Sequence, residues 1–198
     1  MTITINGNGT VTGVSVGGLP DGIVDTDMLA AGAVTGAKKG AGSILQVLQA
    51  HKSDHQSNTS GDEVDITGLS VAITPSSASN KILVCYSVQW GVSGSNNNVY
   101  CAILTYRDST QIDIGDAVGS CQRVSGMDNP GSNYAARRIG NMFLDSPNTT
   151  SAVTYKMVMH NLSATDGRTM HINRTGLTSA GNTNASFTSH ITVMEVAA

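Results

Sequence analysis

The sequence predicts an all-β protein in which short N-terminal strands and a repeat shaft precede an antiparallel β-sandwich of jelly-roll-like architecture. Charged residues make up only 13% of the 198 residues, and 22 residues are glycine. An average soluble domain has roughly 25% charged residues. From Ser43 onward, apolar and β-branched segments recur at short spacing between turn residues, which is typical of a sandwich or barrel. No segment after Ser43 has a sustained helical period.

Residues 1–20 are expected to form an attachment segment. Thr or Ser alternates with Ile or Val over residues 2–16, and Asn6-Gly7 and Asn8-Gly9 interrupt the alternation. This pattern predicts two short strands around a tight turn. Because an isolated strand pair is marginal in water, we expect this segment to dock on a partner or on copies of itself.

Residues 21–42 form a low-complexity connector with a period of ten residues. Val14, Val24 and Val34 share this spacing, and Leu29 follows Leu19 by the same interval. Ordering a residue costs roughly 1–2 kcal/mol, whereas each buried aliphatic side chain returns only about 1.5–3 kcal/mol. A unit with one or two apolar side chains cannot fold alone, so it finds its core in other chains or stays disordered. We therefore expect Val14, Val24, Leu29 and Val34 to be buried against other chains, as three copies around one axis would allow; the resemblance described below implies that they form a trimeric shaft.

Residues 43–198 are expected to form the sandwich head. Strands are predicted over 43–52, 63–74 with a kink at Gly68, 81–92, 99–107, 111–124 with a break at 115–117, 135–145, 152–162, 168–174 and 185–196. If successive strands run antiparallel, loops 53–62, 93–98, 125–134 and 163–167 lie at the end far from the shaft. The same reasoning places loops 75–80, 108–110, 146–151 and 175–184 at the near end.

Composition excludes several classes of protein. The net charge of -3 and the scattered basic residues give no footprint for nucleic acid. No apolar run reaches the roughly 18 residues that a membrane helix needs, so membrane insertion is not expected. The N-terminus lacks the pattern of a secretory signal, which indicates synthesis in a cytoplasm. The odd count of cysteines (Cys85, Cys101 and Cys121) suits buried thiols in a reducing compartment better than a disulfide framework.

Neither an enzyme nor a bound cofactor is predicted. The sequence has no Gly-x-Ser-x-Gly elbow and no phosphate-binding loop, and its scattered aspartates do not show the carboxylate pair of a glycosidase. His51 and His55 fall in a strand-to-loop segment, where their spacing does not bring both to one face as a helix would, so they suggest a metal only where copies of one histidine meet at a trimer axis. Asp108, Asp113 and Asp116 could supply calcium ligands, but solvated turn carboxylates are the preferred interpretation.

Several stretches resemble known virion proteins. The repeat GIVDTDMLAAGAVTGAKKG resembles the shaft repeats of bacteriophage tail fibres and related virion appendages. The blocks SILQVLQAHKSD and VDITGLSVAITPSSASNKILV, and the ending SHITVMEV, are similar to C-terminal β domains of phage fibre proteins, many from phages of aquatic bacteria. The sequence departs from the shaft pattern at Lys38-Lys39, where an apolar residue usually follows the lysine. Only about two clear units are present, so the shaft is short, and residues 93–185 match nothing specific.

This resemblance implies a homotrimeric receptor-binding fibre of the virion, made in the host cytoplasm and mounted on the tail. Its N-terminus would attach to tail or baseplate proteins, and its head would bind a host-surface glycan or protein receptor. The alternative is a neck, collar or capsid-surface fibre with a structural or decorating role.

Receptor recognition favours aromatic rings for stacking on sugars, together with amide and hydroxyl hydrogen bonds, so exposed aromatics among Asn and Asp are the candidates. The candidates at the predicted far end are Trp90, Asn96, Asn97, Asn98, Asp128, Asn129 and Tyr134. For Trp90 the alternative is a place in the core or a trimer interface. For Tyr134 the alternative is packing of its loop on the sandwich.

Overall fold

The computed structural model describes residues 4–5, 11–12, 33–34, 39–93, 99–178 and 184–198. The chain divides into two compact units, Met1–Gly40 and Ala41–Ala198. In the first unit, β1 (Thr4–Ile5) pairs antiparallel with β2 (Val11–Thr12), which confirms the predicted pair of short strands. Of the shaft candidates, Val34 is 51% exposed, whereas Val14, Val24 and Leu29 lie outside the described residues.

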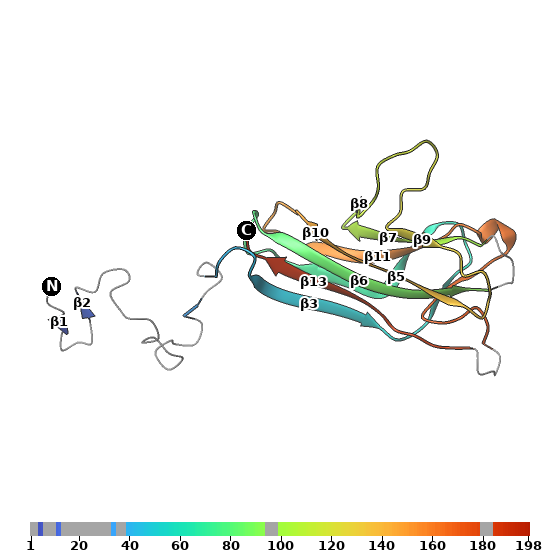
Figure 1. Cartoon of the computed structure of the whole chain (residues 1–198), viewed down its shortest axis with the longest axis horizontal. Helices are drawn as coiled ribbons and strands as arrows, with labels where there is room; N and C mark the ends of the chain where they lie inside the picture. The colour runs from blue at the N-terminus through green and yellow to red at the C-terminus, as the bar shows by residue number, and fades with distance from the viewer. Residues whose placement is uncertain (1–3, 6–10, 13–32, 35–38, 94–98, 179–183) are drawn as a thin grey trace. The chain divides into compact units, whose positions relative to one another are not determined.

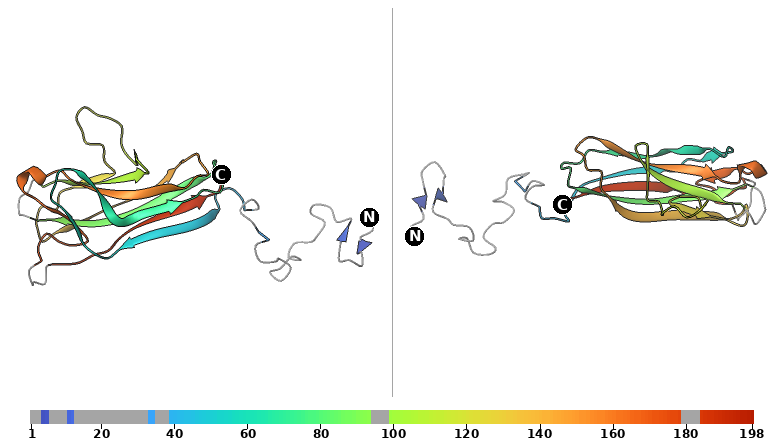
Figure 2. Two further views of the ribbon diagram at one scale, coloured as in Figure 1. Left: turned by 180° about the vertical axis from the view of Figure 1, so that it is seen from behind. Right: turned by 90° about the horizontal axis from the view of Figure 1, so that it is seen from above.

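The second unit is an antiparallel β-sandwich, as the sequence predicts (Figures 1 and 2). Its strands are β3 (Ile44–Lys52), β4 (Gln56–Asn58), β5 (Glu63–Ile73), β6 (Lys81–Val92), β7 (Cys101–Arg107), β8 (Thr110–Ile112), β9 (Gly126–Asp128), β10 (Ala136–Asp145), β11 (Val153–Asn161), β12 (Met170–Ile172) and β13 (Ser189–Val196). The first sheet contains β3, β13, β6, β12 and β4, with β10 also paired to β6. The second contains β5, β11, β7 and β8, with β9 also paired to β7. The described part of the chain contains no α-helix, only a 3₁₀ turn at Ala164–Asp166.

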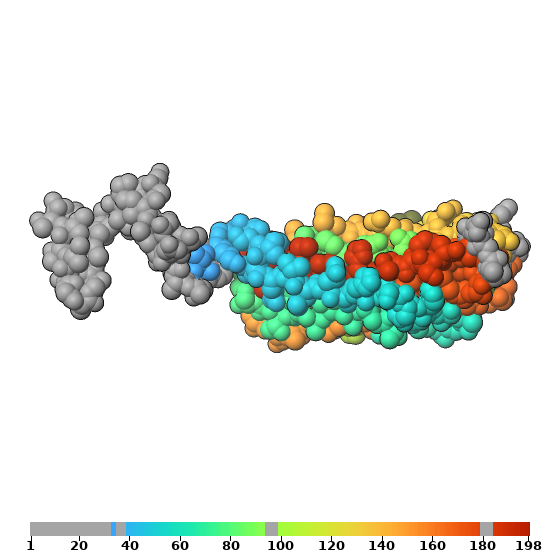
Figure 3. Space-filling model, turned by 90° about the horizontal axis from the view of Figure 1, so that it is seen from below, coloured from blue at the N-terminus to red at the C-terminus, as the bar shows by residue number. Residues whose placement is uncertain are grey.

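Six of the strands make up three longer strands that are each interrupted by inserted residues: β3 with β4, β8 with β9, and β12 with β13. Both β12 and β13 pair antiparallel with β6, with Ile172 opposite Trp90 and His190 opposite Ser87. They are matched by β4 and β3, which pair with β12 and β13 respectively. Likewise β8 and β9 pair with successive parts of β7. Each sheet therefore has four strands once the interruptions are closed, and Figure 3 shows β3 lying beside β13 on the surface.

A single core fills the space between the sheets. The predicted alternation in β6 is confirmed, because Ile82, Val84, Tyr86 and Val88 are all at most 4% exposed. They pack with side chains of the opposite sheet that include Leu69, Ile73, Tyr155, Met157 and Met159. Trp90 continues the same inward face of β6 and is 0% exposed. Trp90 as a receptor-binding residue is therefore wrong, and the alternative of a core position is correct.

One end of the sandwich, here called the near end, holds the C-terminus and the beginning of β3. Ala197 N donates to Ser43 O at 2.9 Å, and Gly42 N donates to Ala197 O at 2.8 Å. Glu195, 1% exposed, closes this end by accepting hydrogen bonds from Ser76 N at 2.6 Å, Asn80 Nδ2 at 2.7 Å and Gln46 Nε2 at 2.7 Å. Burial disfavours its charged form, but these donors outweigh burial and lower the pKa of Glu195.

The opposite end, here called the far end, holds the connection between β4 and β5, the end of β6 and the 3₁₀ turn. Ser93 N donates to Thr169 O, and Tyr100 N donates to Ser163 Oγ, both at 2.9 Å. The prediction that loops 53–62 and 163–167 lie far from the C-terminus is thus confirmed. For loop 93–98, residues 94–98 lie outside the described residues.

Two predictions about the strands and loops of the head are wrong. The strand predicted over 111–124 ends at Ile112, because Asp113 has a φ of 55° and accepts a hydrogen bond from Tyr86 Oη at 2.7 Å. The residues that follow leave the sheet and stand off from it in Figure 1 before β9 begins. The loop predicted over 175–184 is assigned to the wrong end: residues 175–178 belong to the far half, since Gly176 N donates to Asn133 O at 2.9 Å, and residues 179–183 lie outside the described residues. The expected alternation of loops between the two ends fails there, because β12 and β13 do not run antiparallel to each other. Instead, β13 continues β12 in the same direction along β6.

Candidate functional site

The candidate site is a pocket at the interruption between β12 and β13, which form one interrupted strand. Asn173 ends β12 with a φ of 62°, a left-handed conformation that asparagine tolerates better than most residues. Its Nδ2 donates to Lys52 O at 2.9 Å and Asp54 O at 3.0 Å, and its Oδ1 accepts from Ser189 Oγ at 2.6 Å. The side chain is 0% exposed. Asn173 therefore holds together the two interrupted strands at the point where the chain leaves the sheet.

The residues after Asn173 form a narrow excursion over the outer face of β6. An isolated bridge pairs Arg174 with Ser186, and Thr175 N donates to Ala185 O at 3.2 Å. The chain passes so close to Gly91 that a Cβ there would lie 2.5 Å from Arg174 O. Glycine at this position is thus required by the close approach of the two backbones.

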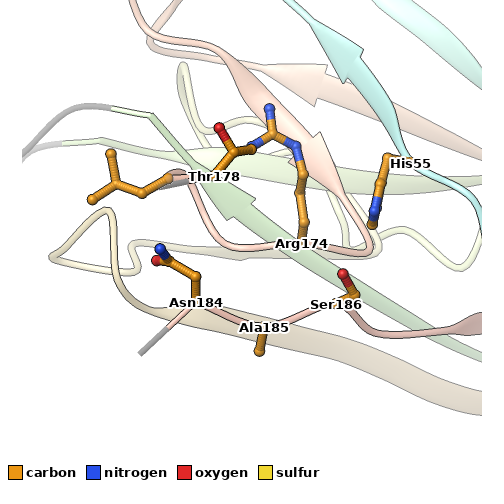
Figure 4. A pocket seen from close by; sticks show the side chains of 7 residues that line it. His55, Arg174, Thr178, Asn184, Ala185 and Ser186 are labelled. Carbon is orange, nitrogen blue, oxygen red and sulfur yellow. The ribbon is translucent and has the colours of Figure 1, made fainter. Parts of the chain in front are cut away.

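A pocket of about 360 Å³ opens beside this excursion. Its lining residues are His55, Arg174, Leu177, Thr178, Asn184, Ala185 and Ser186. Figure 4 shows Arg174 and Thr178 on one side and Asn184, Ala185 and Ser186 on the other, with His55 flanking Arg174. Ligand pockets in proteins commonly measure about 300–1,000 Å³, so this one has room for a small ligand.

The electrostatic character of the pocket is positive. Arg174 Nη2 lies 2.9 Å from His171 Nδ1, and Arg174 Nη1 donates to Thr175 O at 3.3 Å. Within the described residues, no carboxylate forms an ion pair with Arg174. The nearby Asp54 pairs instead with Lys52 at 2.9 Å.

His171 lies behind Arg174 as a neutral base. Its side chain is 4% exposed, and its Nδ1 also lies 2.8 Å from Ser57 Oγ. Burial, followed by electrostatic interaction with Arg174 and then with His55, lowers the pKa of His171 to about 4. Arg174 Nη2 also lies 3.3 Å from His171 Nε2. Since a guanidinium can only donate, the neutral ring accepts from Arg174 through its unprotonated nitrogen. His171 therefore orients Arg174 without compensating its charge.

The remaining predicted receptor residues fall in three groups. Asn96, Asn97 and Asn98 lie outside the described residues. Asp128 ends β9 in a half-exposed ion pair, 3.3 Å from Arg137 Nε, and Asn129 Oδ1 accepts from Gly131 N at 2.8 Å. Tyr134 is 56% exposed, so its ring is available to a ligand. The hydrogen bond from Gly176 to Asn133 connects this loop to the pocket.

Two of the three predicted calcium candidates, Asp108 and Asp113, accept hydrogen bonds from the protein itself. Asp108 Oδ1 accepts from Thr154 N at 2.8 Å, and Asp113 accepts from Tyr86 and Asn141. Across the described ranges, no cluster of three or more His, Cys, Asp or Glu residues could hold a metal ion. His51 lies opposite His190 on β13.

The cysteines only partly match the expectation of buried thiols. Cys101 is buried, which raises the pKa of its thiol to about 12. Cys85 is half-buried on the outer face of β6, and Cys121 is exposed in the insert between β8 and β9. The expectation is therefore wrong for Cys121, because the strand predicted to bury it does not form.

Apart from His55, which is considered as a metal ligand, the pocket residues are not identified by the sequence. The sequence predicts a strand through Arg174 and a near-end loop after it. The available signal was Asn173, a residue that favours left-handed turns, placed just before Arg-Thr-Gly. Tyr100, 44% exposed beside the 3₁₀ turn, is a second exposed aromatic that was not singled out.

Comparisons with known proteins do not place the chain in a family. No protein-family model matches it, and no curated protein matches it significantly. No helix in the described part of the chain has the length and apolar character needed to cross a membrane.

Proposed function

We propose that the protein is a homotrimeric tail fibre of a bacteriophage that mounts on the tail by its N-terminus and binds a host-surface receptor through the far end of its head. The observation that carries this proposal is that the two ends of the head differ. The beginning of β3 and the C-terminus are hydrogen-bonded together at the near end, whereas the pocket lies in the far half. A fibre head needs this separation, since one end must continue into the shaft while the other meets the host.

The architecture of the head supports the same proposal. One sheet has the order β3/β4, β13/β12, β6, β10, and the other β5, β11, β7, β8/β9. Numbered as eight strands, these orders are 1-8-3-6 and 2-7-4-5, the arrangement of an eight-stranded jelly roll. Viral capsid and lectin domains use this architecture. Because one fold hosts many functions, the shaft-like repeat and the pocket must supply the remaining support.

The outer face of the first sheet supports a trimer. At the near end, Val47, Met194, Leu83 and Leu144 are opposite one another across four adjacent strands. We call these four residues the apolar row. Val47 is 55% exposed and Leu144 58%, and the neighbouring Met142 is 64% exposed. The outer face of the second sheet differs, since its apolar cluster of Ala102, Leu104 and Val158 is already covered by the chain's own residues and Lys156 pairs there with Asp65 at 2.8 Å. A second copy of the chain is the occupant that fits, because a short trimeric shaft would bring three near ends together.

An adsorption competition tests the proposal. Host cells preincubated with purified full-length protein should adsorb fewer phage particles, because the free protein occupies the receptor. Unchanged adsorption at saturating protein would refute receptor binding. Antibody labelling of the particle in the electron microscope would reveal the alternative, a neck, collar or capsid fibre, as label away from the tail tip.

A further inference from the structure

We propose that the pocket between β12 and β13 binds the anionic group of an acidic saccharide, with Arg174 as its principal ligand. This inference rests on the proposed receptor-binding function and names the chemistry of the receptor. The shared ligand chemistry is an oxyanion attached to a sugar ring, which either a carboxylate or a phosphate can supply.

Arg174 meets the requirements for an anion ligand. It is only partly exposed, its charge has no carboxylate partner among the described residues, and it faces a cavity rather than open solvent. Its contacts with His171 and Thr175 leave guanidinium donors unused. A guanidinium presents five donors in a planar fork that matches carboxylate and phosphate oxygens.

The contact with His171 holds the Arg174 side chain in one orientation. His171 is fixed by its strand and by Ser57 Oγ, so the guanidinium rests against a buried, neutral ring. A carboxylate at the position of His171 would have neutralised the arginine and removed its attraction for an external anion. The imidazole orients the guanidinium and leaves its charge for the ligand.

The rest of the lining suits a sugar. Thr178 and Ser186 contribute hydroxyls and His55 an imidazole, which can bond to sugar hydroxyls, while Leu177 and Ala185 offer apolar surface to a ring face. The volume of about 360 Å³ accommodates one or two sugar rings. The pocket is also accessible, since His55, Thr178, Ala185 and Ser186 are all exposed.

Ligand-observed NMR titration of the full-length protein tests the inference with three probes: sodium glucuronate, glucose and glucose 6-phosphate. Glucuronate should bind about tenfold or more tightly than glucose, which has the same ring without the charge. Arg174→Gln should weaken glucuronate binding by about tenfold or more, and Arg174→Lys should restore only part of the loss. Arg138→Gln, at an exposed arginine of β10, is the matched control and should bind as the wild type does.

The outcomes are distinct. Preferential binding of glucose 6-phosphate supports the oxyanion site and assigns it to phosphate. Equal binding of glucose and both anions, or no effect of Arg174→Gln, overturns the inference. Because Arg174→Gln also removes a contact with His171, Thr178→Val and Ser186→Ala provide surface variants that should weaken binding several-fold without altering the fold. Cell binding that persists in Arg174→Gln refutes this inference alone, whereas absence of cell binding by the wild type refutes the proposed function.

Discussion

Asn173 is predicted to be the residue on which the interrupted strand and its pocket depend most. Asn173→Gly keeps the left-handed backbone available but removes three side-chain hydrogen bonds, to Lys52 O, Asp54 O and Ser189 Oγ. A net hydrogen bond contributes about 0.5–1.5 kcal/mol, and a buried group left without a partner costs about 1–3 kcal/mol. We therefore expect the substitution to lower the free energy of unfolding by about 3 kcal/mol.

The backbone contribution can be separated from the hydrogen bonds. Asn173→Ala removes the same three bonds and also places a Cβ at a φ of 62°, which should cost about 1 kcal/mol more than glycine. Asn148 is the matched control, because it has a φ of 53° but is exposed, and within the described part of the chain its side chain does not hold strands together. Asn148→Gly should change the free energy of unfolding by less than about 0.5 kcal/mol.

The assay is equilibrium unfolding in urea of the full-length chain, followed by far-UV circular dichroism. All variants must be compared at one protomer concentration, because subunit association adds to apparent stability. A loss below about 1 kcal/mol for Asn173→Gly would refute the assignment of Asn173 as the organising residue. Equal stability of the Gly and Ala variants would refute the argument from the backbone.

Three further predictions concern the near end and the shaft. Glu195→Gln should destabilise the head by about 2–3 kcal/mol at neutral pH, because it removes a charged acceptor of several hydrogen bonds. Since folding lowers the pKa of Glu195, its contribution is present above the ordinary value of 4.5 and is lost as pH falls through the folded value, so urea unfolding at acidic pH should show a smaller difference. Leu144→Glu should weaken the trimer about tenfold or more in sedimentation equilibrium, because three charges would enter an apolar contact, and unchanged association would remove the apolar row from the interface. Val24→Asp combined with Val34→Asp should leave the β-rich spectrum intact but shift sedimentation toward smaller species, whereas persistence of trimers would exclude these valines from the shaft.

Much of the head could be predicted because apolar alternation determines which face of a strand is buried. Ile82 through Val88 alternate cleanly and form the core face of β6. The sequence predicts a kink at Gly68, and the φ of 83° at this residue explains why a glycine stands within β5. The same periodicity, continued by one more step, would have placed Trp90 in the core instead of at the surface.

The interruptions could not be predicted because they depend on pairing between distant segments. The break at Asp113 is stabilised by Tyr86 and Asn141, which are 27 and 28 residues away. The break at Asn173 is stabilised by Lys52 and Asp54, more than a hundred residues earlier. Local composition shows turn residues at both places but does not show that pairing resumes along the same neighbouring strand. Arg174 and the pocket depend on that resumption.

A cryo-electron microscopy reconstruction of the protein on its virion tests the account most directly. We predict three copies around one axis at the tail, with Ser43 and the C-terminus of each head facing the shaft and the Arg174 pocket facing outward. Density on the capsid or collar, or the pocket buried against the particle, would contradict the account.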